Sequence, residues 1–202
     1  MADAMLISAQ TAEVTMRNIR EGGMMTTGAR GVNAPDLTYV DAARTLIAQI
    51  VEENPGRRAL RHVSEIGSLP LQNKASLRDD EPFSLHVMLP GENIETFERA
   101  LAALIKVFAE FREDDRMIRA GTRKREGWLK PLCRVEVSPP DLWAQIDMGP
   151  MQYQFGEFKS AVNSALENDE RFRLGRQSLC FVNQEVIAKI ADGFADTAEG
   201  GN

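Results

Sequence analysis

Three short segments of alternating apolar and polar residues constrain the fold most, because proline and glycine turns separate them. They span residues 132–137, 142–148 and 151–155, with Pro139-Pro140 and Gly149-Pro150 between them. A period of two is typical of strands that bury one face, and close spacing favours antiparallel neighbours. The pattern predicts a β-meander.

A long amphipathic helix is predicted just before this meander, over residues 93–112. Its apolar stripe is broad enough to require a large packing partner such as a sheet. Further strands are predicted at 83–89 and 177–182, and further helices at 158–167 and from Asn183 onward. The sequence therefore predicts an α+β fold in which a long helix packs on an antiparallel sheet. The stripe comprises Phe97, Leu101, Leu104, Ile105, Phe108 and Phe111.

The N-terminal third is predicted to be helical. Ala12, Met16 and Ile19 share one face of a helix over residues 8–22, which Gly22-Gly23 ends. An extended piece (24–27) and a glycine loop (28–31) follow. Thr38 and Asp41 then have the spacing of a capping box, which predicts a second helix ended at 54–56. A shorter helix is expected at 58–66.

The domain organisation is predicted from a polar stretch at 67–82, which contains two prolines and a charged run. Such a composition is typical of a linker. We therefore expect a helical module over residues 1–75, an α+β domain over 76–196 and a flexible tail over 197–202.

Charge and cysteine content limit the environment and the partners. The net charge of −6 disfavours attraction of nucleic acid by the whole surface. No apolar run approaches the roughly 20 residues that a membrane span requires. Cys133 and Cys180 lie in separate apolar stretches, which suits buried thiols in a reducing compartment. We expect a cytoplasmic protein that does not insert into a membrane.

No catalytic or metal-binding constellation is apparent. His62 and His86 are the only histidines, and we expect both to be structural. The spacings of zinc sites are absent, and the glycines at 28 and 31 lack the rest of a nucleotide-binding motif. We therefore expect neither enzyme activity nor a metal or cofactor.

A basic stretch runs from Arg116 to Arg134, with seven basic residues against the single acid Glu126. Arginine forks and an aromatic ring can hold phosphate and stack a base. A basic loop that pairs with the surplus of surface acids, or that contacts an acidic partner, explains the stretch equally well. The candidate phosphate contacts are Arg119, Arg123, Lys124, Arg125 and Trp128.

Residues 19–25 (Ile-Arg-Glu-Gly-Gly-Met-Met), followed by 28–31 (Gly-Ala-Arg-Gly), resemble the recognition helix and wing of winged-helix DNA-binding modules. Over residues 11–52 the chain is also similar to uncharacterised proteins that recur near phage and prophage genes. The resemblance implies that the helix enters the major groove of double-stranded DNA and that the wing arginine reaches the backbone or minor groove. It assigns DNA contact to Gln10, Thr11, Arg17, Arg20 and Arg30.

Two features depart from such modules. Few residues precede the first helix, so the helices at 38–66 are expected to support it. Acidic and basic residues also balance over residues 1–35. The leading hypothesis is a non-enzymatic DNA-binding regulator or packaging-type accessory protein of phage type, whose remainder dimerises or senses a partner. The alternative is a structural or assembly protein, such as a virion component, that forms a homo-oligomer or binds a protein and ignores nucleic acid.

Overall fold

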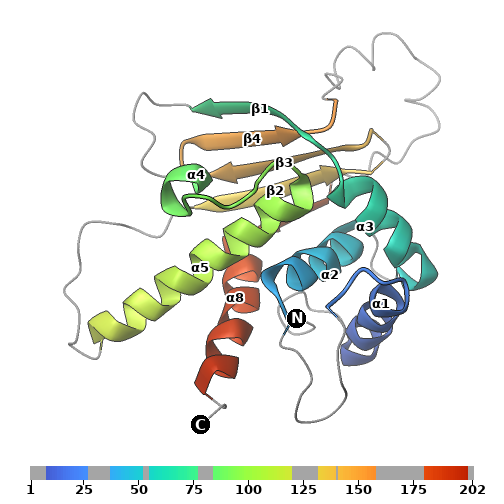
Figure 1. Ribbon diagram of the computed structural model, residues 1–202, viewed down its shortest axis with the longest axis horizontal. Helices are drawn as coiled ribbons and strands as arrows, with labels where there is room; N and C mark the ends of the chain where they lie inside the picture. Colours follow the sequence, from blue (N-terminus) through green and yellow to red (C-terminus); the bar gives the residue numbers. More distant parts are fainter. Residues whose placement is uncertain are drawn as a thin grey trace.

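The computed structural model describes residues 8–26, 37–51, 55–76, 84–119, 132–139, 141–157 and 180–199. Within these ranges the protein is an α+β fold: N-terminal helices lead into a five-stranded antiparallel sheet, and a helix follows the last strand (Figure 1). The strands are β1 (Leu71–Ser76), β2 (Cys133–Ser138), β3 (Trp143–Met148), β4 (Met151–Phe155) and β5 (Cys180–Asn183).

The predicted meander is confirmed as the centre of the sheet. The strand order is β1-β4-β3-β2-β5, and every neighbouring pair is antiparallel. On β3, Ile146 stands between Val135 of β2 and Tyr153 of β4. The turn at 149–150 and the hydrogen bond from the Leu142 amide to the Pro139 carbonyl help to set these registers, which place every second residue of each strand on the same face.

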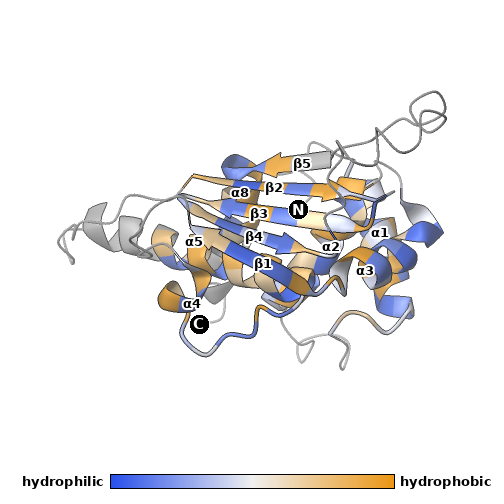
Figure 2. Cartoon of the chain, turned by 90° about the horizontal axis from the view of Figure 1, so that it is seen from above, coloured by the Kyte–Doolittle hydropathy of each residue, from blue (hydrophilic) through white to orange (hydrophobic). Residues whose placement is uncertain are grey.

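The helices lie on one face of this sheet (Figures 1 and 2). Alternate strand residues such as Val135, Ile146 and Tyr153 are fully buried beneath them. The predicted long helix is confirmed, and its Phe97 ring lies 5.5 Å from the ring of Phe155 on β4. The helices are α1 (Ala9–Glu21), α2 (Tyr39–Val51), α3 (Ala59–Gly67), α4 (Leu85–Met88), α5 (Phe97–Arg119) and α8 (Gln184–Glu199), with a single 3₁₀ turn η1 (Gly56–Arg58) before α3.

One hydrophobic core joins α2, α5 and α8 to the buried face of the sheet. Leu46 and Ile47 of α2 belong to the same buried cluster as Leu104 of α5 and Ile187 of α8. A smaller cluster lies under α1, where Ile19 and Met25 pack with Ala48 of α2 and with Ala59 and Val63 of α3. The main core therefore draws on residues from both sides of the expected boundary near residue 75.

The predicted strand at 83–89 is wrong, because residues 85–88 form the short helix α4. The Ser84 hydroxyl accepts a hydrogen bond from the Val87 amide at 3.2 Å and so caps a helical turn. The Leu85 amide donates to the buried Tyr153 hydroxyl at 2.7 Å. Alternation of apolar residues over so short a segment does not separate a strand from one helical turn.

The predicted linker at 67–82 contains β1, which the sequence pattern did not indicate. This strand is polar, and it forms because β4 supplies a backbone ladder in which Asn73 pairs with Gln154 and Lys74 with Tyr153. The start of β1 is also fixed by the Leu71 amide, which donates to the Glu95 carbonyl at 2.8 Å. The predicted helix at 158–167 lies outside the described residues, and α8 continues to Glu199, into the expected tail.

Candidate nucleic-acid interface

Helix α1 is fixed to the molecule by one buried face. Ala12, Thr15 and Ile19 recur on that face and are at most 5% exposed. The Thr15 hydroxyl accepts a hydrogen bond of 2.7 Å from the buried Gln49 amide of α2. The helix begins at Ser8, whose hydroxyl accepts from the Thr11 amide at 3.0 Å. As expected, α2, η1 and α3 support α1.

The opposite face of α1 is exposed and carries two of the five residues predicted to contact DNA, Gln10 and Arg17. Gln10 and Arg17 are seven residues apart, so at about 100° per residue they lie on nearly the same line along the helix. The Arg17 guanidinium is 3.2 Å from the Glu13 carboxylate, and both side chains are mainly in solvent. This face therefore presents an amide and an ion pair outward.

Thr11 and Arg20 occupy the two flanks of α1. They are nine residues apart, which separates them by about 180° around the helix. Thr11 is half-buried, and its hydroxyl lies 2.8 Å from the Ser8 hydroxyl. Arg20 is exposed in the last turn. The structure thus gathers Gln10 and Arg17 on one line and sets Thr11 and Arg20 on either side of it.

The end of α1 follows the sequence prediction. Gly23 has a φ of 74°, the left-handed conformation that glycine takes without a steric penalty. Its amide donates to the Arg20 carbonyl at 2.9 Å, and the Met24 amide donates to the Ile19 carbonyl at 3.0 Å. These two bonds form a Schellman motif, which turns the chain sharply away from the helix axis.

The segment after α1 is then held against α2 by two charged side chains. Arg44 donates to the Met24 carbonyl at 2.6 Å and also forms a bidentate ion pair with Glu98 of α5, at 2.8 and 3.1 Å. Asp41 accepts from the Thr26 amide at 2.9 Å. The chain therefore leaves α1 along a path fixed by the first turns of α2.

Asp41 also binds the chain at Thr38, just before α2 begins. Its second carboxylate oxygen accepts from the amide and the hydroxyl of Thr38, each at 2.8 Å, and its own amide donates to that hydroxyl at 3.1 Å. The predicted capping box is confirmed. Burial would raise the pKa of Asp41, but the hydrogen bonds from Thr38 and Thr26 outweigh it and lower the pKa. One ionised carboxylate thus binds both ends of segment 27–37, which includes Arg30; Arg30 itself lies outside the described residues.

Helix α1 packs on η1 and α3, so four exposed arginines lie on elements that contact one another; we call them the arginine cluster, a grouping that the sequence did not predict. Gly22, the C-cap of α1, lies against the Leu60 side chain of α3. Within three residues of these two positions there is only one acid, Glu21. The cluster comprises Arg20, Arg57, Arg58 and Arg61, all exposed. A run of arginines is visible at 57–61 in the sequence, but its position beside α1 depends on the tertiary fold.

The second predicted basic site is described only at its margin. Arg119 is the last residue of α5. Arg123, Lys124, Arg125 and Trp128 lie outside the described residues. Among the described residues, nothing brings this stretch to the outer face of α1.

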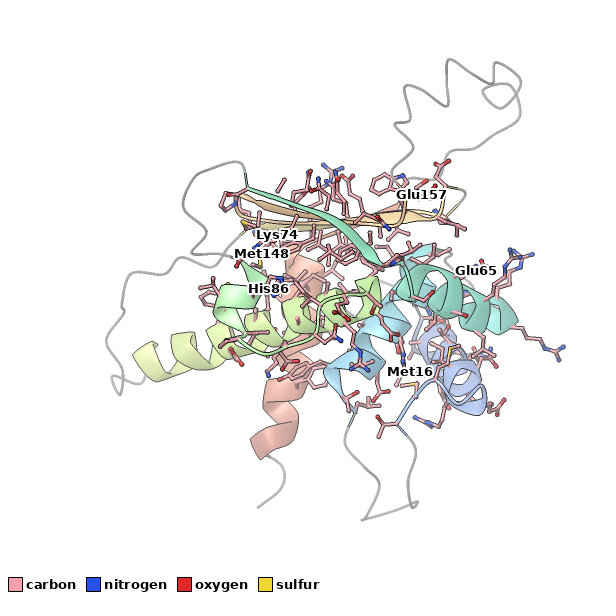
Figure 3. All side chains as sticks on the ribbon, turned by 45° about the horizontal axis from the view of Figure 1, so that its top comes forward. Met16, Glu65, Lys74, His86, Met148 and Glu157 are labelled. Atoms are coloured by element: carbon pink, nitrogen blue, oxygen red, sulfur yellow. The ribbon has the colours of Figure 1, made fainter. Side chains whose placement is uncertain are left out.

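The outer face of the sheet carries a network of amides and carboxylates. Asn73 donates to Gln154, which donates to Gln145 and Gln152, at 3.3, 3.4 and 3.1 Å respectively. Gln145 and Gln152 then donate to the Asp147 carboxylate at 2.9 and 3.1 Å. All described helices lie on the other face, and side chains stand on both faces (Figure 3). The arrangement offers hydrogen-bond donors and acceptors.

The described residues contain no cluster of three or more histidine, cysteine or acidic side chains that could hold a metal ion. Cys133 is buried on β2. Among the same residues, no helix combines the length and apolar character that a membrane crossing requires.

Comparison of the chain with protein-family models, with curated proteins and with solved structures gave no match.

Proposed function

We propose that this protein is a non-enzymatic DNA-binding regulator or packaging-type accessory protein of phage type, which contacts duplex DNA through the outer face of α1. One observation supports this most. Helix α1 is anchored by its buried face, and the arginine-bearing segment that follows it begins and ends at Asp41. A helix fixed by one face, followed by a segment whose two flanking residues are anchored to the same side chain, supports a winged-helix-like reader.

The residues on α1 fit distinct contacts. Gln10 lies in the first turn, and a glutamine amide can pair with the donor and acceptor edge of adenine. Arg17 lies on the same line and suits guanine or phosphate, while Arg20 on the flank suits phosphate. The Glu13–Arg17 ion pair is exposed, so releasing it costs only about 0.2–1 kcal/mol. Thr11 is placed for a contact at the edge of the groove, and Arg30 would supply the loop contact.

Fluorescence anisotropy with labelled mixed-sequence duplexes at low salt tests this proposal. Wild type should bind, and Q10A/R17A should bind more weakly because it loses groups that face the groove. Arg99→Ala is a matched control, since it removes an exposed arginine from α5 rather than from α1. Absence of binding by wild type, or equal loss in R99A and Q10A/R17A, would refute the proposal.

A second candidate function is supported by the outer face of the sheet. Its amide network presents donors and acceptors across β1, β4 and β3, which suits a structural or assembly protein that binds another subunit. This function predicts a defined oligomer whose mass is unaffected by duplex DNA. Size-exclusion chromatography with light scattering measures it, and a monomer at all concentrations would count against it.

A further inference from the structure

The arginine cluster stands out against the acidic charge of the chain. Four arginines lie within three residues of the contact between Gly22 and Leu60, and the acids beside them are Glu21 and Glu65, the partner of Arg61, whereas the whole chain has a net charge of −6. The sequence of residues 1–35 alone is electrically balanced. The local positive charge appears because the fold places η1 and the start of α3 beside the C-terminal end of α1.

The cluster residues differ in what already binds them. Arg61 is paired with Glu65 at 2.9 and 3.0 Å, and Figure 3 shows Glu65 on the outer side of α3. Arg20 and Arg57 are exposed on neighbouring elements, at the end of α1 and in η1. A guanidinium presents several hydrogen-bond donors in one plane, and their geometry matches the oxygens of a phosphate. Arginine therefore suits phosphate binding better than a cation that acts as a single point charge.

The position of the cluster relative to Gln10 also matters. Gln10 lies in the first turn of α1 and the cluster lies at the other end, about 20 Å away for a helix of 13 residues. The major groove is about 12 Å wide. A helix that reads bases with its first turns therefore brings its far end, and any cations beside it, to the phosphates that border the groove.

We infer that Arg57, Arg58 and Arg61 form a phosphate-contacting surface that holds the DNA backbone beside α1, together with Arg20. The inference builds on the proposed function, because it assigns the backbone contacts of the same interface. It also accounts for DNA affinity in an acidic protein: the required cations come from η1 and α3 and not from the reading helix. Contacts of this kind position the protein and carry no base preference.

The salt dependence of binding to two duplexes of different sequence tests the inference. Each lost phosphate contact should lower the magnitude of the slope of log K against log salt by about 0.9. R57Q/R58Q should therefore lower it by about 1.8, and should weaken binding to both duplexes by the same factor. The matched variant R57K/R58K keeps the charges and should retain the wild-type slope. Equal thermal midpoints of the variants would show that the fold is intact.

Each outcome separates the two proposals. Absence of wild-type binding to any duplex overturns both. Wild-type binding with an unchanged slope in R57Q/R58Q leaves the proposed function standing and overturns the phosphate surface. A change in preference between the two duplexes also overturns it, because the arginines would then read bases. Binding of an acidic peptide in place of duplex would show that the cluster serves a protein partner, and would count against both.

Discussion

Replacing Asp41 by asparagine should destabilise the protein and release both ends of segment 27–37. The carboxylate accepts hydrogen bonds from the Thr26 amide, the Thr38 amide and the Thr38 hydroxyl. Hydrogen bonds to a charged group contribute about 1.5–3 kcal/mol each. Asparagine keeps one acceptor oxygen but turns an NH₂ group toward an amide that also donates. The contributions of these hydrogen bonds are not additive, so the total loss is smaller than their sum. We therefore expect the free energy of unfolding to fall by about 3 kcal/mol.

Thermal and urea unfolding measure this loss. For a domain of this size, about 3 kcal/mol corresponds to a fall in Tm of about 6–12 °C. Glu95→Gln is a matched control, because it neutralises an exposed carboxylate and should change stability by less than about 0.5 kcal/mol. An Asp41→Asn variant as stable as Glu95→Gln would refute the role assigned to the carboxylate.

The pH dependence gives a second check on the same carboxylate. The folded-state pKa of Asp41 is lowered, because its hydrogen bonds outweigh the effect of burial. A lowered pKa stabilises the fold fully above the unfolded value of about 3.9, and this contribution is lost as the pH falls through the folded value. The stability difference between wild type and Asp41→Asn should therefore be constant from about pH 5 to 7 and shrink below about pH 4. A difference that persists unchanged at acid pH would contradict this reasoning.

Substitutions at three further positions test other features of the fold by thermal or urea unfolding. Gly23→Ala should cost about 1 kcal/mol, because a side chain at a φ of 74° is strained although the space around it is open; no change would mean that the turn relaxes. Arg44→Met should cost about 2–4 kcal/mol, because it leaves the largely buried Glu98 carboxylate and the Met24 carbonyl without their donor. Arg44→Lys should recover only part of this stability, since lysine cannot make the bidentate pair. Full recovery by Arg44→Lys would contradict the bidentate geometry. Tyr153→Phe should cost about 1–3 kcal/mol, because the buried Leu85 amide loses its acceptor; an unaffected Tm would show that α4 is not tied to the sheet by this bond.

Local sequence signals predicted the elements whose stability is local. The capping box at Thr38 and Asp41, the glycine stop after α1 and the meander of β2 to β4 each depend on residues close in the chain. β1 could not be predicted in this way, because its sequence is polar and it forms a strand only by pairing with β4. The same applies to the candidate interface. The outward face of α1 is visible from its periodicity, whereas the position of Arg57 and Arg58 in η1, next to α1, depends on tertiary packing.

Asp41 binds the chain on both sides of segment 27–37, at Thr26 and at Thr38. Thr26 and Thr38 are both held by Asp41, so the two points at which this segment joins the helices are fixed by a side chain of α2. The hydrogen bonds that hold these two points come from Asp41 and not from the segment between them. Thr26 and Thr38 are therefore expected to keep their positions when the sequence between them changes.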